Sequence, residues 1–263
     1  MRTTLRRAPL GFLGLAGVAA LFFALPLLGL VLRAPWGRTA IELLAPESLE
    51  ALRLSLVCSV LATAVALVCG VPLAWINARV AYPGRDVVRA LVTLPMVLPP
   101  VVGGVALLLA FGRGGLLGPA LEACCGIRLP FTTAGAAMAE AFVAMPFLVI
   151  TVEAGLRSMD LRYEDAARTL GARGWTLFNR VTVPLVAPSL AAGTVLCWAR
   201  ALGEFGATIT FAGNFPGRTQ TLPLAVYQEL EERPDGAVML SLLLLAVSLM
   251  VLIGLRRRWL GAV

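Results

Sequence analysis

Six long apolar segments constrain the fold of this chain more than any other feature. They occupy residues 10–32, 51–78, 90–111, 132–156, 188–211 and 236–255. About twenty apolar residues in an α-helix are enough to cross the hydrocarbon core of a bilayer. Only 14% of the residues are charged and 59% are hydrophobic, whereas about a quarter of the residues of a soluble domain are charged. The sequence therefore predicts an all-α integral membrane protein with about six transmembrane helices.

The first apolar segment follows Arg2, Arg6 and Arg7 and resembles a secretory signal peptide in outline. The apolar core of a cleavable signal is shorter, about 7–15 residues. We therefore expect a transmembrane helix here, followed by an extracytoplasmic connector. The predicted parts are this helix and connector in residues 1–50, a core of five transmembrane helices in 51–255, and a cytoplasmic tail in 256–263.

The third apolar segment contains Pro95, Pro99 and Pro100, which should interrupt its helical hydrogen bonds. Non-helical backbone at membrane depth is tolerated where it packs against protein or lines a wet cavity. The segment is therefore either the wall of a translocation pathway or a kinked packing helix. The sequence leaves both open.

The arginines indicate the orientation in the membrane. The termini, the 79–89 turn and the segment after residue 156 hold fourteen of them, and the other three loops hold six. Cytoplasmic loops are enriched in positive charge, so both termini are expected in the cytoplasm. The net charge of +7 thus follows from topology, and binding to nucleic acid is not needed to explain it.

Charged residues inside the apolar segments are costly and should face the protein interior. Arg200 and Glu204 lie one helical turn apart and are expected to neutralise each other, in a packing or a gating role. Glu140 and Glu153 are expected nearer the ends of their helix, where water lowers the cost. We give these two little functional weight.

Enzyme chemistry within this chain finds no support in its sequence. The chain has no histidine and no lysine, and the phosphate-binding loop of ATPases needs a lysine. The five cysteines lack zinc-ligand spacing and are expected to be small buried hydrophobes. We expect no catalytic, cofactor or metal site.

A polar segment, Glu164 to Pro184, separates two long apolar segments. Asp160 is a plausible N-cap of a helix, Glu164 and Asp165 fall in its first turn, and Gly171 stands where it would end. A second short helix should follow until Pro184 prevents its simple continuation. Composition alone leaves two interpretations, a solvated loop or a docking element for another protein.

The spacing of this segment resembles a known motif. Asp165-Ala166-Ala167, three residues, Gly171, nine residues and Val181-Thr182-Val183-Pro184 is similar to the cytoplasmic loop of ABC-importer permease subunits. That motif reads Glu-Ala-Ala, three residues, Gly, nine residues, Ile, one residue, Leu-Pro. The chain departs by Asp at 165 and Val at 181 and 183, which keeps the charge and the branching.

Further stretches resemble the molybdate permease type of this family. They are residues 94–103, 199–211 and 213–223, and the resemblance covers about residues 50–255. Sulfate and thiosulfate permeases share much of the pattern. The resemblance implies a type I ABC-importer permease fold in a bacterial or archaeal cell membrane, in contact with lipid. It also implies a second copy of the chain, two cytoplasmic ATPase subunits that use ATP, and an extracytoplasmic oxyanion-binding protein.

The resemblance also implies site residues. The ATPase-coupling loop would be residues 157–187, with small side chains that let a helix lie close to the ATPase and with Trp175 and Phe178 as anchors to the bundle. The coupling residues would be Glu164, Asp165, Ala166, Ala167, Gly171 and Pro184. The pathway or gate residues are expected to be Pro99, Pro100, Arg200, Glu204, Thr208 and Thr210.

Rival functions remain at this point. The nearest alternative is the same kind of ABC importer with sulfate, thiosulfate or tungstate as its cargo. A secondary transporter that uses Glu140 and Glu204 as proton carriers is a second, which would need no docking loop. A membrane enzyme is the weakest alternative, since no nucleophile, metal or cofactor motif is recognisable.

Overall fold

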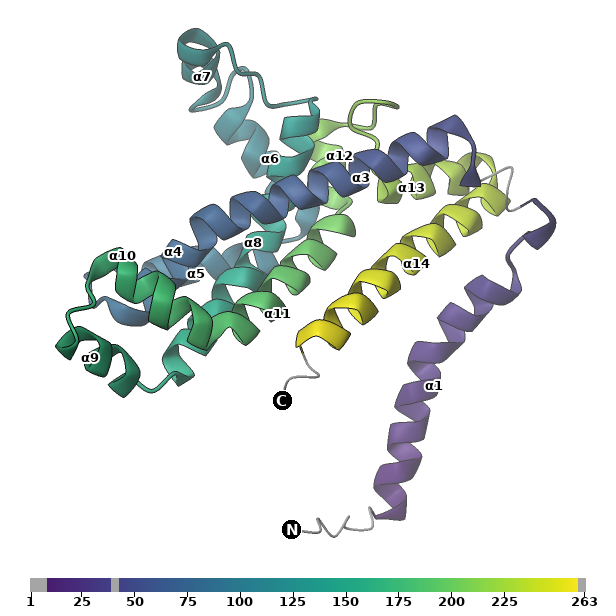
Figure 1. Ribbon diagram of the computed structural model, residues 1–263. Helices are drawn as coiled ribbons and strands as arrows, with labels where there is room; N and C mark the ends of the chain where they lie inside the picture. The colour runs from purple at the N-terminus through teal and green to yellow at the C-terminus, as the bar shows by residue number, and fades with distance from the viewer. Residues whose placement is uncertain (1–8, 39–42, 260–263) are drawn as a thin grey trace.

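The computed structural model describes residues 9–38 and 43–259, and the regular elements of this part of the chain are helical (Figure 1). Five helical segments are long and apolar enough to cross a membrane. They are Gly11–Leu32, Pro46–Arg79, Thr133–Ser158, Gly174–Leu202 and Pro234–Val251. The prediction of an all-α, multi-pass membrane protein is confirmed.

The third predicted span is divided into α5 (Arg85–Val97) and α6 (Pro100–Phe111). Leu98 and Pro99 between them have extended backbone, with ψ angles of 138° and 132°. Each of these residues precedes a proline, and a residue before proline is pushed out of the helical region by the proline ring. The predicted interruption is confirmed at Pro99 and Pro100, where it splits the span into two short helices, and is wrong at Pro95, which lies inside α5.

The centre of the bundle is α8 (Thr133–Ser158), which packs against α3 (Pro46–Val65), α4 (Val71–Arg79) and α11 (Val183–Leu202). Small residues make this close packing possible, as is usual between membrane helices. A Cβ atom added to Gly155 would clash with Oγ of Ser189 on α11. The two helices therefore touch through their smallest side chains.

Two long spans each contain one wider helical turn followed by a proline. The turn η2 (Ala66–Gly70) precedes Pro72, and the turn η3 (Phe178–Thr182) precedes Pro184. A π-type turn bonds five residues back instead of four, so the helix axis continues past a proline that has no N–H to donate. Pro184 thus prevents a simple α-helical continuation, as expected, but the second helix is not short, because it runs on past the π-type turn.

The fifth span also differs from its prediction at both ends. The helix runs continuously over Gly174–Leu202, through α10 (Gly174–Leu177), η3 and α11. It breaks at residues 203–205, and the rest of the predicted segment forms the separate short helix α12 (Gly206–Ala212). The apolar composition continues across the break, so the hydropathy pattern alone did not reveal it.

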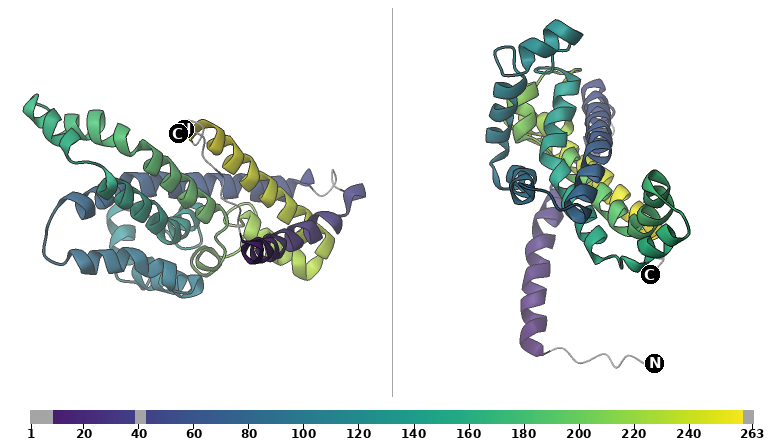
Figure 2. Two further views of the ribbon diagram at one scale, coloured as in Figure 1. Left: turned by 90° about the horizontal axis from the view of Figure 1, so that it is seen from below. Right: turned by 90° about the vertical axis from the view of Figure 1, so that its left-hand side faces the viewer.

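The first helix, α1 (Leu10–Leu32), stands apart from the bundle (Figures 1 and 2). None of its most apolar window is buried within the chain. It is apolar all round, as expected of a helix that faces lipid. Its contact is with α14 (Pro234–Trp259), which continues into the predicted tail. Arg2, Arg6 and Arg7 lie outside the described residues.

The remaining short elements are η1 (Trp36–Arg38), α7 (Gly118–Cys125) and α13 (Leu222–Glu232). Cys58 and Cys197 are buried in the bundle, as expected. Cys69, Cys124 and Cys125 are exposed, so the expectation of burial is wrong for these three. Cys69 lies on an outward face of its span, and the adjacent pair ends α7, which projects from the bundle.

Candidate functional site

The segment between α8 and α11 forms a helical projection at one end of the bundle, labelled α9 and α10 in Figure 1. The Asp160 carboxylate accepts a hydrogen bond from the Arg162 N–H at 3.0 Å, at the start of α9 (Arg162–Thr169). Gly171 has a φ of +90°, a left-handed conformation that glycine adopts most easily, and it reverses the chain after α9. The helix end at Gly171 is confirmed, whereas the N-cap of α9 is Leu161, one residue after the predicted Asp160.

Glu164 fixes α9 to the bundle. Its side chain is 3% exposed and accepts a hydrogen bond from Oγ1 of Thr182 at 2.9 Å. The same carboxylate pairs with Arg79 of α4 at 3.4 Å and with Arg168 at 3.6 Å. Because Glu164 points inward, it positions the loop and is not part of the surface that a partner would touch.

The outer side of α9 is exposed and carries Asp165 and Ala166, whereas Ala167 is half-buried and Pro184 lies exposed in α11. Asp165 is 66% exposed and pairs with Arg168 at 2.8 Å. Ala166 and Gly171 are also exposed, and Leu170 is 89% exposed. Small and apolar side chains beside exposed charge suit contact with another protein.

An aromatic cluster joins the second half of this loop to α4. Phe178 lies edge-on to Trp75, with ring centroids 6.4 Å apart, and stacks on Trp175 at 5.4 Å. Trp175 itself is 74% exposed, so most of its surface lies outside this cluster. These rings border a largely apolar groove of about 960 Å³ between the loop and the second span.

A charge network at the same end of α8 was not predicted as a site. Glu153 pairs with Arg89 at 2.7 Å and with Arg157 at 2.8 Å. The backbone carbonyl of Asn77, near the end of α4, accepts hydrogen bonds from Arg85, Arg89 and Arg157. This network ties the α4–α5 turn to α8. The four-residue spacing of Glu153 and Arg157 was the only sequence signal for it.

Arg200 and Glu204 form the predicted intramembrane ion pair. The distance from Nη1 to Oε2 is 2.6 Å, and Oε1 of Glu204 accepts the Ala207 N–H at 2.8 Å. The Glu204 side chain is 1% exposed, whereas that of Arg200 is 28% exposed. The pair therefore spans the break between α11 and α12, and its carboxylate caps the first turn of α12.

The two interrupted helices meet. A Cβ atom added to Gly206 would lie 2.8 Å from Cβ of Pro100, and one added to Gly104 would lie 2.5 Å from Cβ of Thr210. The start of α6 therefore lies directly against α12. Oγ1 of Thr210 is already bonded to the Gly206 carbonyl at 2.8 Å.

The other pathway candidates occupy different environments. Pro99 and Pro100 are exposed at the break before α6. Thr208 is fully buried, and its hydroxyl has no hydrogen-bond partner among the described residues. Thr208 is therefore the one predicted pathway hydroxyl without a hydrogen-bond partner in the described part of the chain.

Glu140 lies deeper than expected. It is 1% exposed, in the second turn of α8, and its Oε2 has no hydrogen-bond partner within the described part of the chain. The expectation of a hydrated position near the helix end is wrong, because α3 and α12 pack against α8. Across residues 9–38 and 43–259, no group of three or more metal-ligating side chains of the His, Cys, Asp and Glu types is found.

Known proteins are similar to this chain in sequence and in fold. The molybdenum transport system permease protein ModB of Mycobacterium tuberculosis is 47% identical over 93% of this chain and 91% of its own length. The sulfate transport system permease protein CysT of Escherichia coli is 36% identical over 94% and 92%. A chain of the same fold occurs in the structure of a bacterial alginate ABC transporter in complex with an alginate pentasaccharide-bound periplasmic protein. The two chains superpose with a TM-score of 0.76 at 17% sequence identity, over 94% of this chain and 92% of that one.

The family model described as "binding-protein-dependent transport system inner membrane component" matches residues 66–261. This range contains the α9 projection, both interrupted helices and the Arg200–Glu204 pair. The fold is that of a type I ABC-importer permease. The chain therefore belongs to the family of binding-protein-dependent transport system inner membrane components.

Proposed function

We propose that this chain is the membrane-spanning permease subunit of an ATP-driven importer that carries molybdate into the cytoplasm. The observation that carries the proposal is the α9 projection, whose motif surface is exposed while Glu164 anchors it to two other parts of the bundle. Molybdate is favoured because the molybdenum permease relative is more similar to the chain than the sulfate permease over a comparable length.

The proposal assigns partners to both sides of the membrane. Two copies of this chain would join two cytoplasmic ATPase subunits, which hydrolyse ATP, and an extracytoplasmic oxyanion-binding protein. The arginine distribution supports a cytoplasmic location for both termini and for α9. Without a lysine, the chain cannot supply the phosphate-binding loop itself, so a partner subunit must supply it.

Coupling follows from the contacts of α9. Closure of the ATPase pair would displace the motif surface formed by the exposed Asp165, Ala166 and Gly171 and the half-buried Ala167. The buried contacts of Glu164 with Arg79 and Thr182 would pass this displacement to α4 and to the helix that continues into α11. Rigid-body motion of packed helices is an established way to alternate access across a membrane.

The pathway would run beside the two helix breaks. Pro99 and Pro100 have no N–H to donate and so leave backbone groups outside the helical hydrogen-bond pattern before α6. Thr208 offers an unpaired hydroxyl nearby on α12. The Arg200–Glu204 pair would serve as a gate at the α11–α12 break. Weak successive contacts of this kind let an ion move on, whereas tight binding would hold it.

The test is reconstitution of the chain in vesicles with its ATPase and its binding protein. We expect molybdate-loaded binding protein to stimulate ATP hydrolysis and molybdate uptake more than sulfate-, thiosulfate- or tungstate-loaded protein. Stronger stimulation by another anion would reassign the cargo. Uptake without any ATPase subunit would refute the importer assignment.

A proton-coupled secondary transporter is favoured by one observation, the buried and unpaired Glu140. Its other candidate carrier, Glu204, already binds Arg200 and the Ala207 N–H. If this alternative were correct, a pH gradient alone would drive uptake, and Glu140→Gln would abolish it. We expect no uptake under a pH gradient without ATP.

A further inference from the structure

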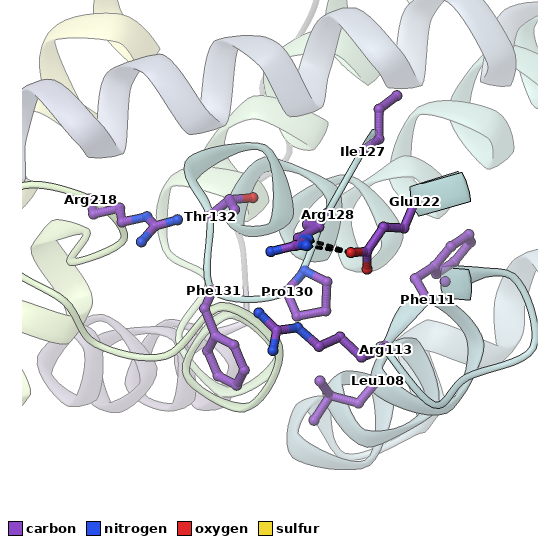
Figure 3. Close-up of a pocket in the computed structure, with 12 residues that line it drawn as sticks. Leu108, Phe111, Arg113, Glu122, Ile127, Arg128, Pro130, Phe131, Thr132 and Arg218 are labelled. Atoms are coloured by element: carbon purple, nitrogen blue, oxygen red, sulfur yellow. Dashed lines mark hydrogen bonds and ion pairs between the residues drawn. The ribbon is translucent and has the colours of Figure 1, made fainter. Parts of the chain in front are cut away.

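A basic pocket opens at the end of the bundle away from α9. Its volume is about 420 Å³, and it is lined by the end of α6, by α7, by residues 127–132 before α8, and by Arg218 from the loop after α12 (Figure 3). Three arginines line it, Arg113, Arg128 and Arg218, and the only acidic side chain among the lining residues is Glu122. The lining therefore carries a net charge of +2, which complements a dianion.

The arginines of the pocket are not equally engaged. Nε of Arg128 donates to Glu122 at 2.7 Å, and the two residues form an ion pair. Neither Arg113 nor Arg218 forms an ion pair or a side-chain hydrogen bond within the described part of the chain. Figure 3 shows the Arg113 side chain crossing the centre of the pocket and Arg218 at its side. Two guanidinium groups are thus free to bind a ligand.

The backbone that carries these arginines is fixed. The turn after α6 is held by hydrogen bonds from the Leu116 N–H to the Leu109 carbonyl at 3.0 Å and from the Leu117 N–H to the Ala110 carbonyl at 2.8 Å. Oγ1 of Thr133 donates to the Arg218 carbonyl at 2.8 Å. Arg113 and Arg218 are therefore presented from positioned segments.

The backbone of one residue that lines this pocket is strained. Phe131, which lines the pocket, has a φ of +60° and is the one non-glycine residue with positive φ among those described. Left-handed backbone at such a residue is costly and is often retained at ligand-binding sites. The strained residue thus lies in the segment that lines the pocket just before α8.

The pocket and the α9 projection lie at opposite ends of α8, which is 26 residues and therefore about 39 Å long. With α9 in the cytoplasm, the pocket faces the outside. From it, α6 leads back through the membrane to the Pro99–Pro100 break. The pocket is thus the outer end of the element that our proposed pathway uses.

We infer that the pocket of Arg113, Arg128 and Arg218 is an entry site that binds a tetrahedral oxyanion dianion on the extracytoplasmic side. This inference rests on the proposed function. Guanidinium groups bind oxyanions through paired N–H donors. One water occupies about 30 Å³ of liquid volume, so the pocket has room for the anion and several waters. The anion is held in hydrated form and is readily released toward the pathway.

The test uses the full chain in lipid nanodiscs, without its ATPase and without a binding protein. Binding of radiolabelled molybdate is measured for the wild type, for Arg113→Gln, for Arg218→Gln and for the double variant. The matched control is Arg33→Gln, since Arg33 is an exposed arginine on the same side of the membrane in our topology. Elution as a single species in size-exclusion chromatography checks folding.

We expect saturable binding that sulfate displaces, about tenfold weaker in each single variant because each removes one charge-assisted hydrogen-bonding group. The double variant should lose binding almost completely, and Arg33→Gln should stay within about twofold of the wild type, as expected for a group outside the site. Equal binding by the wild type and the double variant would overturn the inference.

A second measurement separates the pocket from a protein-docking surface. If the double variant weakens association with the anion-free binding protein but binds molybdate as the wild type does, the arginines dock acidic side chains and the inference is wrong. Failure of the proposed function is distinct, because it appears as a wild-type transporter without ATP-driven molybdate uptake. Normal uptake together with no anion binding by the isolated chain refutes only the entry site.

Discussion

Glu164→Gln tests how α9 is held to the bundle. The substitution keeps an oxygen that accepts the Thr182 hydroxyl but removes the charge that pairs with Arg79 at 3.4 Å. At an effective dielectric constant of about 20, two charges at that distance attract by about 5 kcal/mol before desolvation is subtracted. The Arg79 side chain is only 13% exposed, so it would be left poorly hydrated. We expect a net loss of about 2–3 kcal/mol in the stability of the α9 attachment, at or just below the lower end of the roughly 3–5 kcal/mol typical of a broken buried pair.

The assay is hydrogen–deuterium exchange of residues 161–172 in the full chain in nanodiscs. A loss of about 2–3 kcal/mol should make exchange about 30- to 150-fold faster in this segment. Exchange in α8 should not change. In the reconstituted transporter, ATP hydrolysis should persist while molybdate transported per ATP falls.

The matched control is Asp165→Asn, one residue away. Asp165 forms an exposed pair with Arg168, and exposed pairs contribute only about 0–1 kcal/mol. We expect little change in exchange for this variant. If Glu164→Gln and Asp165→Asn give the same exchange rates, the buried anchor does not hold α9 and the reasoning is refuted.

Three further predictions follow from the structure. Gly171→Pro should abolish co-purification of the ATPase subunit while leaving the chain monodisperse, because a φ of +90° is closed to proline; retained co-purification would contradict this. Gly104→Ala should lower the midpoint of thermal unfolding in detergent, because the added Cβ would lie 2.5 Å from Cβ of Thr210, at a cost of about 1–3 kcal/mol. The control Gly14→Ala should leave the midpoint unchanged, since a Cβ atom there would have nothing within 4 Å. A hydrogen bond to Glu231 raises the pKa of Tyr227 above its ordinary 10.0, so the phenol keeps its proton to higher pH; Glu231→Gln should bring the pKa seen in an ultraviolet titration back toward 10.0, and an unchanged titration would contradict the assignment.

The α9 motif shows which features can be predicted from residue spacing alone. Spacing located the end of α9 at Gly171 and its N-cap to within one residue of Asp160, because capping depends on local backbone geometry and a few neighbouring residues. The inward direction of Glu164 was not predictable. It depends on Arg79, which lies 85 residues earlier in the chain, and on the angle at which α9 meets the bundle.

The prolines of the polar segment and the third span illustrate a second limit. Pro99 and Pro100 were correctly expected to interrupt a helix, since consecutive prolines remove donors and restrict the preceding residue. Pro184 has the same chemistry, yet the helix passes it through a π-type turn. Tertiary contacts between the Phe178 ring and Trp75 accompany that turn. Such contacts are not local in sequence.

The sequence by itself determined that this is a helical membrane protein, how its spans are ordered, and where its polar motif lies. These properties depend on hydropathy, charge and short-range spacing, which each segment carries within itself. Only the tertiary structure decided that α6 meets α12, that Glu164 is an anchor, and that Arg113, Arg128 and Arg218 share one pocket. Each of these depends on segments that lie far apart in the chain and pack closely in space. Where α6 meets α12, small residues such as Gly104 and Gly206 let the two backbones approach.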